Sequence, residues 1–130
     1  MEYEQPFWRP VTAIHQADRD GNPATAADPS WTSLRPAPPY PDSPSGHGCV
    51  SSAVAEALEG LFGEGELDMD VHSAVTETTR HHDSADAWLD DVTDARIWLG
   101  FHSRDAMHDA CQIGADVAEA VLDCRFGSRH

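Results

Sequence analysis

Apolar residues recur at helical spacing in three stretches of this chain, over about 46–62, 84–100 and 104–124. In each stretch they return every three or four residues, so that they line one face of a helix while polar residues fill the rest. Each stretch therefore predicts one amphipathic helix. The residues of these apolar faces are Val50, Val54, Leu58, Leu61 and Phe62, then Trp88, Val92 and Leu99, then Ala106, Ala110, Ile113, Val117, Ala120, Val121 and Cys124.

Residues that start and stop helices lie at the ends of these stretches. Gly63 ends the first pattern, and either Asp83 or Ser84 stands at the N-cap of the second. Gly100 closes the second helix, and Ser103 precedes the third. We therefore expect a break between the last two helices.

The remaining segments lack a sustained helical pattern. Residues 7–17 predict a short helix with Pro10 in its first turn. Residues 18–44 hold seven of the nine prolines and predict a long ordered loop or a linker. Residues 63–83 are acidic and mixed, and no element is assigned to them. The whole pattern predicts an all-α fold, a helical bundle with a long Pro-rich loop, in a single domain 1–130.

The net charge of the chain argues against one class of function. The chain has 23 Asp and Glu residues against 8 basic ones and a formal net charge of −15, which argues against a nucleic-acid partner. No apolar run is long enough to span a membrane, and the N-terminus resembles no signal peptide, so the protein is expected to be soluble and cytoplasmic by default. Cys49, Cys111 and Cys124 have no CxxC spacing, which favours buried thiols over disulfides.

The strongest candidate for chemistry is the octapeptide Pro41–Gly48, at the start of the predicted helix 46–62. The proline-rich segment before it cannot be helical, so the backbone N–H groups of Ser45 and Gly46 should lie at a helix N-terminus, which favours an anion. His47 in the same turn is placed to donate or accept a proton beside that anion. The segment therefore predicts an oxyanion site.

Three further residues, Arg9, Arg96 and His102, could complete this site. Arg96 falls on the predicted apolar face of its helix, where a buried guanidinium needs an anionic partner. Alternatively, its stem packs on the helix and its head reaches a surface carboxylate. A helix break between Gly100 and Ser103 would let Arg96 and His102 converge on one point, whereas the alternative for His102 is an ordinary loop histidine.

A second histidine cluster offers a weaker candidate. His81, His82 and Asp83, with His72 nearby, could ligate a metal ion. Adjacent histidines project in different directions and no histidine pairs with a carboxylate at helical spacing, so a solvated segment is the favoured interpretation. Arg80, His81 and His82 could instead line the rim of the anion site.

Three sequence islands together resemble the signature of the superfamily that unites type 2 phosphatidic acid phosphatases (PAP2), bacterial acid phosphatases and vanadium-dependent haloperoxidases. The islands are Trp8-Arg9-Pro10, then Pro44-Ser45-Gly46-His47, then Arg96 with His102 six positions later. Three matching islands in the family order are far more specific than an isolated Ser-Gly-His. The resemblance spans about Phe7 to Val121, and the amino-acid sequence between the islands is most similar to bacterial homologues of the haloperoxidase branch.

This resemblance implies a role for each matching residue. His102 would be the axial ligand to the vanadium of vanadate, or the nucleophile that becomes a phosphohistidine in a phosphatase. His47 would be the acid–base. The implied cofactor is vanadate, with phosphate as the alternative substrate or inhibitor. The groups that bind the equatorial oxygens would be Arg9, Ser45, the N–H of Gly46, and Arg96.

Three features depart from the family pattern. The family Lys should lie seven residues before Arg9, where this chain has Glu2, and all eight basic residues are Arg. Family members have helices before the Arg-Pro segment, so we expect the chain to be the C-terminal part of a larger helical domain, completed by an N-terminal portion, a partner chain or a homo-oligomer. Ala106 stands where the phosphatase branch has an Asp that orients the last histidine, which favours the haloperoxidase branch or no catalysis.

Three functions remain open from the sequence. The first is a vanadate-dependent enzyme that oxidises halide with hydrogen peroxide. The second is a metal-independent acid phosphatase that hydrolyses a phosphate ester through a phosphohistidine. The third is a truncated, non-catalytic remnant. The missing Lys favours the third, and the retention of Arg9, His47, Arg96 and His102 in register favours the first two.

Overall fold

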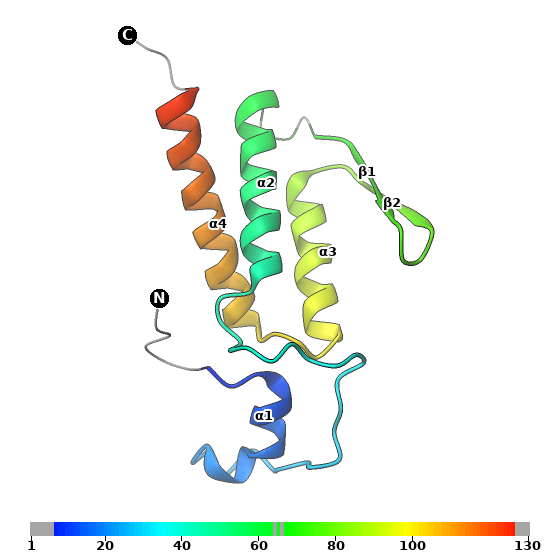
Figure 1. Cartoon of the computed structure of the whole chain (residues 1–130), viewed down its shortest axis with the longest axis vertical. Helices are drawn as coiled ribbons and strands as arrows, with labels where there is room; N and C mark the ends of the chain where they lie inside the picture. The colour runs from blue at the N-terminus through cyan, green and yellow to red at the C-terminus, as the bar shows by residue number, and fades with distance from the viewer. Residues whose placement is uncertain (1–6, 64, 66, 127–130) are drawn as a thin grey trace.

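The computed structural model describes residues 7–63, 65 and 67–126. The three long helices form a bundle, while a short N-terminal helix and a long loop lie across one end of it (Figure 1). The elements in chain order are α1 (Pro10–His15), a 3-10 helix (Ala17–Arg19), α2 (Gly46–Phe62), β1 (Met69–Ser73), β2 (Thr78–His82), α3 (Ala85–Trp98) and α4 (Arg104–Arg125).

A serine caps each of the three long helices. The Oγ atoms of Ser45, Ser84 and Ser103 accept the backbone N–H three residues later, at 3.4, 3.1 and 3.2 Å. Such caps satisfy a backbone donor that the first helical turn leaves unpaired. Gly63 (φ 107°) and Gly100 (φ 74°) follow α2 and α3 with the positive φ that glycine adopts at low cost. The three long helices predicted from the sequence are thus confirmed, and α1 is shorter than predicted.

Helix α2 lies between α3 and α4 in the bundle (Figure 1). It runs in the same direction as α4, because a Cβ on Gly48 would meet Ala110 at 2.7 Å and one on Gly60 would meet Leu122 at 2.5 Å. These contacts mean that the two backbones approach closely along their length. Helix α3 runs the opposite way, so the N-termini of α2 and α4 and the C-terminus of α3 meet at one end of the bundle.

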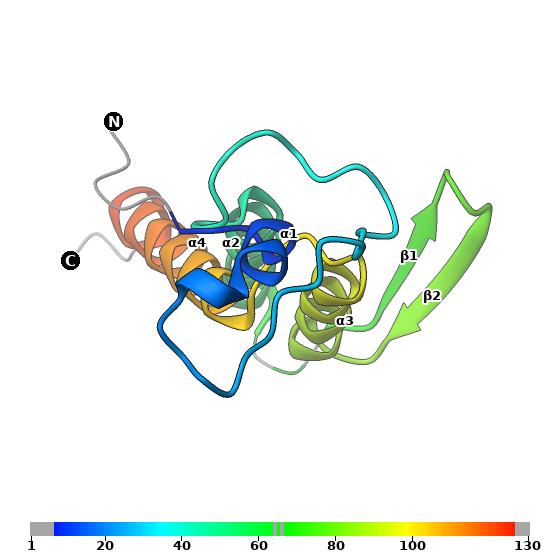
Figure 2. The same ribbon diagram turned by 90° about the horizontal axis from the view of Figure 1, so that it is seen from below.

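The predicted helical bundle is present, but the fold is not purely all-α, because residues 63–83 contain a β-hairpin. Strands β1 and β2 pair antiparallel, and Met69 lies opposite His82 while Ser73 lies opposite Thr78. The hairpin projects beside α3, away from the rest of the bundle (Figure 2). Most of its residues are exposed on both faces, so its apolar residues do not alternate clearly, and the sequence carries no strong strand signal.

The hairpin is attached to the bundle by a small apolar cluster. Its buried members are Ala55 on α2, Leu67 before β1, and Ala85 at the start of α3. Met69 and Trp88 pack against this cluster and are partly buried. The fold is therefore a helical bundle with one small two-stranded sheet.

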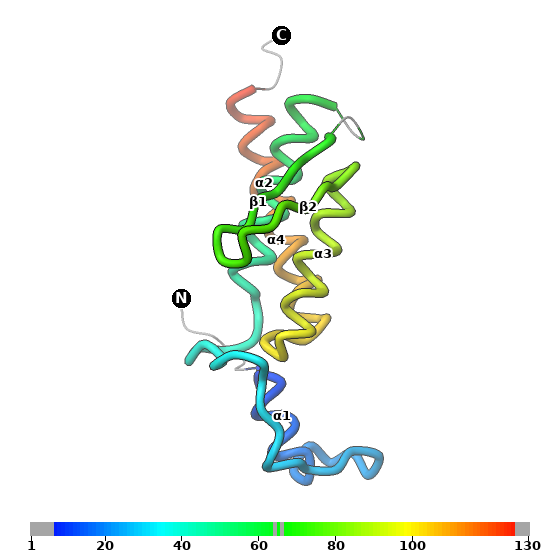
Figure 3. Tube along the Cα trace, turned by 90° about the vertical axis from the view of Figure 1, so that its right-hand side faces the viewer, coloured from blue at the N-terminus to red at the C-terminus, as the bar shows by residue number. Residues whose placement is uncertain are grey.

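The Pro-rich loop is ordered by contacts at the lower end of the bundle, where it runs past α1 (Figure 3). The carbonyl of Trp31 is hydrogen-bonded to His15 Nε2 at 2.8 Å, and the N–H of Leu34 donates to the carbonyl of Leu99 at 3.1 Å. The Trp31 ring covers Gly100 so closely that a Cβ there would lie 2.6 Å from it. The loop thus fixes the chain between α3 and α4.

Several apolar side chains of α2 and α4 are exposed to solvent. None of the helices in the described ranges has the length and apolar character needed to cross a bilayer.

Candidate anion-binding site

The predicted site residues gather at the end of the bundle where α2 and α4 begin and α3 ends. Ser45 caps α2, Arg96 lies in the last turn of α3, and His102 lies just before α4. Arg9 precedes α1 and lies at the same end, since it donates to the carbonyl of Phe101. Two helix N-termini point to this end, and each contributes a partial positive charge.

His102 is held by a buried carboxylate that the sequence did not single out. Its Nδ1 lies 2.8 Å from Oδ1 of Asp42 and 2.9 Å from the carbonyl oxygen of the same residue. His102 is 2% exposed and Asp42 is 1% exposed. Since both neighbours of Nδ1 are acceptors, Nδ1 carries a proton, and Nε2 lies on the opposite edge of the ring, away from Asp42.

Asp42 is itself fixed by the start of α4. Its Oδ2 accepts the backbone N–H of Ser103 at 3.1 Å and the hydroxyl of Ser103 at 2.6 Å. Burial would raise the pKa of Asp42, but the hydrogen bonds from His102 and Ser103 outweigh it and hold that pKa below the ordinary value of 3.8. The carboxylate therefore stays charged at neutral pH.

Nε2 of His102 is buried and has no hydrogen-bond partner among the described residues. A buried polar atom of this kind is uncommon in a folded protein and calls for a ligand or another explanation. Its orientation is set from the opposite side of the ring by Asp42. The ring is thus positioned to bind or attack an electron-poor centre.

Arg9 is anchored to backbone carbonyls. Its three guanidinium nitrogens donate to the carbonyls of Tyr40 at 2.6 Å, Phe101 at 2.8 Å and Pro41 at 3.4 Å. The guanidinium also stacks on the Tyr40 ring, 4.5 Å from its centre. These contacts join the N-terminal segment, the octapeptide and the α3–α4 connection, and they leave one N–H on each terminal nitrogen free for an anion.

Arg96 is buried without a carboxylate partner. It is 9% exposed, and its guanidinium lies 4.8 Å from the centre of the Phe101 ring. Its Nε has no hydrogen-bond partner in the part of the chain that the structure describes. Burial, with a smaller contribution from the charge of Arg9, lowers the pKa of Arg96. The guanidinium groups of Arg9 and Arg96 thus both lie beside Phe101. Neither forms an ion pair with a carboxylate among the described residues.

Ser45, Gly46 and His47 form the first turn of α2. The Ser45 side chain is fully buried, and since its Oγ accepts the Gly48 N–H, its own proton remains available to donate. The space beside Gly46 is open, because a Cβ there would meet no atom within 4 Å. Partial burial, followed by the charges of Arg96 and His102, lowers the pKa of His47 below 6.5. His47 thus lies in the first turn of α2, at the same end of the bundle as Arg96 and His102.

The other candidates lie elsewhere. Arg80 on β2 pairs with Asp91 of α3 at 2.5 Å, and His81 pairs with Asp70 on β1 at 3.1 Å. Among the described residues, no three His, Cys, Asp or Glu side chains are arranged to hold a metal ion. The metal-binding alternative for His72, His81, His82 and Asp83, which the sequence does not favour, thus finds no such cluster among the described residues. Glu2, the residue at the family Lys position, lies outside the described residues.

Asp42 was missed because it lies sixty residues before His102 in the sequence. The family resemblance points instead to the fourth position after His102, which is Ala106 in this chain. The available signal was an acidic residue inside the octapeptide, next to prolines that bring the chain into an extended course. The helix break predicted between Gly100 and Ser103 does bring Arg96 and His102 to the same end of the bundle.

The bundle and its histidine–arginine end define a helical-bundle domain of the vanadium haloperoxidase superfamily. The chain belongs to the family of the VCPO second helical-bundle domain, whose profile matches residues 2–126. No curated protein matches the chain by sequence.

Solved structures agree with this membership. The chain is similar to the first bacterial vanadium-dependent iodoperoxidase, with a TM-score of 0.73 and 28% identity over 88% of this chain and 26% of that one. It is also similar in fold to a bacterial vanadium-dependent chloroperoxidase. The holo form gives a TM-score of 0.66 at 21% identity over 92% of this chain and 31% of that one. The apo form gives 0.65 at 23% identity over 92% and 32%. The chain thus spans between a quarter and a third of these relatives.

Proposed function

We propose that this chain binds vanadate at the end of the bundle where α2 and α4 begin, and that the site oxidises halide with hydrogen peroxide. The observation that carries this proposal is the buried Nε2 of His102, which has no partner and is oriented by Asp42 from the other side of the ring. The names of the solved relatives, a vanadium-dependent iodoperoxidase and a chloroperoxidase, support the choice of vanadate.

The residues present fit such an oxyanion. His102 would be its nitrogen ligand, and its oxygens would accept hydrogen bonds from the free N–H groups of Arg9 and Arg96. The hydroxyl of Ser45 and the N–H of Gly46 would complete the donor set. Ser45 and Gly46 stand at the positive end of α2, and hydrogen bonds to an anion are strong where water is excluded. Bound vanadate would activate hydrogen peroxide toward a halide as a Lewis acid.

His47 is suited to move protons beside this anion. Its lowered pKa keeps the free imidazole neutral near pH 7, so that it can accept a proton from an incoming oxygen acid. A bound anion would raise this pKa again and stabilise the protonated ring. The same group can therefore serve as base first and as acid later.

Hydrolysis of a phosphate ester is the second candidate, because the unpartnered Nε2 of His102 also suits a nucleophile. The Nε2 lone pair would attack phosphorus and form a phosphohistidine, while the P–O bond breaks and His47 gives its proton to the leaving alcohol. His47 would then remove a proton from the water that cleaves the P–N bond. Phosphate and vanadate are both tetrahedral oxyanions and use the same donors.

Both enzyme functions depend on positive charge that this chain supplies without Lys. Arg9 and Arg96 provide it, and neither is neutralised by a described carboxylate. If these two groups cannot hold an oxyanion without the family Lys, the third possibility, a truncated and non-catalytic remnant, accounts for the chain.

The decisive experiment is equilibrium binding of orthovanadate to the purified chain, with phosphate as competitor. His102→Ala removes the proposed ligand, and His108→Ala is the matched control because its side chain is 82% exposed on α4. We expect saturable binding that His102→Ala abolishes and His108→Ala leaves unchanged. Circular dichroism of each variant reports whether it is folded.

Turnover assays on the vanadate-loaded and the metal-free chain then separate the two enzymes. Halide oxidation that requires vanadate supports the haloperoxidase, and ester hydrolysis that vanadate inhibits supports the phosphatase. A folded chain that binds neither anion contradicts both.

A further inference from the structure

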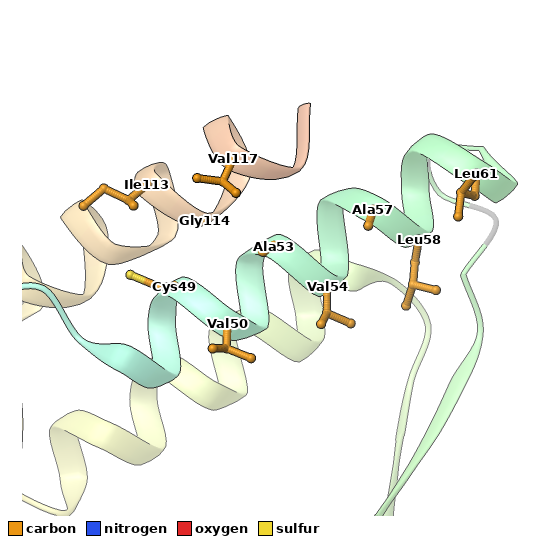
Figure 4. Close-up of a pocket in the computed structure, with 10 residues that line it drawn as sticks. All are labelled: Cys49, Val50, Ala53, Val54, Ala57, Leu58, Leu61, Ile113, Gly114 and Val117. Carbon is orange, nitrogen blue, oxygen red and sulfur yellow. The ribbon is translucent and has the colours of Figure 1, made fainter. Parts of the chain in front are cut away.

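An apolar groove runs along one face of the bundle between α2 and α4, with a volume of about 440 Å³ (Figure 4). One wall is formed by Val50, Val54 and Leu61 of α2, and the other by Ile113 and Val117 of α4. Their exposed fractions range from 43% for Val54 to 66% for Val50. Five branched aliphatic side chains in one continuous row are more than the scattered apolar residues of an ordinary surface.

The groove has the spacing of a helix-binding seam. On α2, Val50, Val54, Ala57 and Leu61 follow one another at intervals of four, three and four residues. On α4, Ile113, Val117, Ala120 and Cys124 repeat the same intervals. This alternation is that of the a and d positions of a heptad, whose side chains pack against a neighbouring helix. Each seam extends about 16 Å, or three helical turns.

A row of carboxylates follows the outer edge of this seam on α4. Asp109, Asp116 and Asp123 are exposed and lie seven residues apart, so they line one side of the helix. In a heptad that places Ile113 at d and Val117 at a, all three occupy the g position, which faces the charged edge of a neighbouring helix. Acidic g positions favour Lys or Arg on that neighbour.

We propose that the α2–α4 groove is a docking surface for an amphipathic helix of about three turns that carries an apolar seam flanked by Lys or Arg. A small ligand fits less well, because the groove is open and long and its lining offers no side chain more polar than the thiol of Cys49 to orient one. A second copy fits less well, because each chain carries a net charge of −15 and the same acidic edge. The docked helix would cover the apolar side chains that α2 and α4 expose along the groove.

Two synthetic probe peptides test this proposal on the full chain. Both are three-heptad helices with Leu at a and d, and they differ only in Lys or Glu at the flanking e and g positions. Fluorescence anisotropy measures their binding at low and at physiological salt. We expect saturable one-to-one binding of the Lys peptide, and binding of the Glu peptide at least roughly tenfold weaker, since a few surface ion pairs sum to about that factor.

Variants of the chain locate the binding surface. Val117→Asp places a charge in the groove at a half-exposed position, and Val75→Asp is its control in the hairpin turn, where the side chain is 87% exposed. Asp116→Lys reverses one charge on the acidic edge of α4. Asp90→Lys makes the same charge reversal on α3, away from the groove, and is its control. We expect Val117→Asp and Asp116→Lys to weaken the Lys peptide at least several-fold and both controls to leave it unchanged. Circular dichroism verifies that each variant is helical.

Three results overturn the proposal. The first is no saturable binding of the Lys peptide to the folded chain. The second is equal binding of both peptides, or binding that Val117→Asp leaves intact. The third is self-association in sedimentation equilibrium that Val117→Asp removes, because the occupant of the groove would then be a second copy.

Discussion

Replacing Asp42 with Asn tests the central contact of the site with almost no change in shape. In the native chain, Oδ1 of Asp42 accepts from His102, and Oδ2 accepts two hydrogen bonds from Ser103. In Asp42→Asn, one side-chain oxygen becomes an NH₂ group. Whichever way the amide turns, one donor of His102 or Ser103 then faces another donor.

The expected loss of stability follows from these contacts. A buried N–H left facing a donor costs about 1–3 kcal/mol, and the two surviving hydrogen bonds lose the strengthening of a charged acceptor. The free energy of unfolding at pH 7 should therefore fall by about 2–4 kcal/mol. The affinity for vanadate should fall about 10- to 100-fold, as it does when other partners that orient a ligating histidine are removed.

The lowered pKa of Asp42 also predicts how the free energy of unfolding changes with pH. The pKa of Asp42 is lower in the folded chain than its ordinary value of 3.8, so the charged carboxylate stabilises the fold above that value. This contribution is lost as pH falls through the lowered pKa of the folded state. The contribution of the Asp42 carboxylate to the difference in unfolding free energy between the native chain and Asp42→Asn should therefore be present at pH 5 and shrink below about pH 4.

Urea unfolding from pH 3 to pH 7 and vanadate titration at pH 7 measure both effects. Asp90→Asn, an exposed carboxylate on α3, is the control and should change neither quantity. If Asp42→Asn lowered stability by no more than this control, or bound vanadate as tightly as the native chain, the hydrogen-bond argument would be refuted.

Three further variants or titrations follow from the same site. His47 should titrate below 6.5 in the free chain and at higher pH when phosphate or vanadate is bound, as followed by NMR of its ring protons; a free-chain midpoint of 6.5 or above would contradict this. Gly100→Ala should lower the free energy of unfolding by about 1–3 kcal/mol, because φ is 74° and the Trp31 ring fills the space; an unchanged urea midpoint would argue against that packing. Arg96→Leu should remove vanadate binding without lowering stability, because it replaces a buried and unpaired charge beside the Phe101 ring; a clear loss of stability in urea would show that Arg96 holds the fold together.

The helices could be predicted because their signals are local. Ser45, Ser84 and Ser103 cap them, and Gly63 and Gly100 end two of them. The residues that determine these helix ends therefore lie within a few positions of them. The hairpin could not be predicted in the same way. Its strands expose both faces, so no buried side imposes a two-residue alternation on the sequence.

The candidate site was predicted in part for the same reason. Ser45, Gly46 and His47 are contiguous, and their relation to a helix start is local. Asp42 and His102 are brought together only by the course of the loop and the break after α3, which no spacing rule reports. The carbonyl contacts of Arg9 likewise depend on three backbone segments that are distant in sequence.

The parallel course of α2 and α4 makes the molecule electrically asymmetric. The chain as a whole repels anions with a net charge of −15, yet two helix N-termini together with Arg9 and Arg96 draw them to one end. Salt screens the distant repulsion beyond about 8 Å but acts weakly on contacts inside a buried site. Capture of a small oxyanion by this acidic chain should therefore become faster, not slower, as inert salt is added.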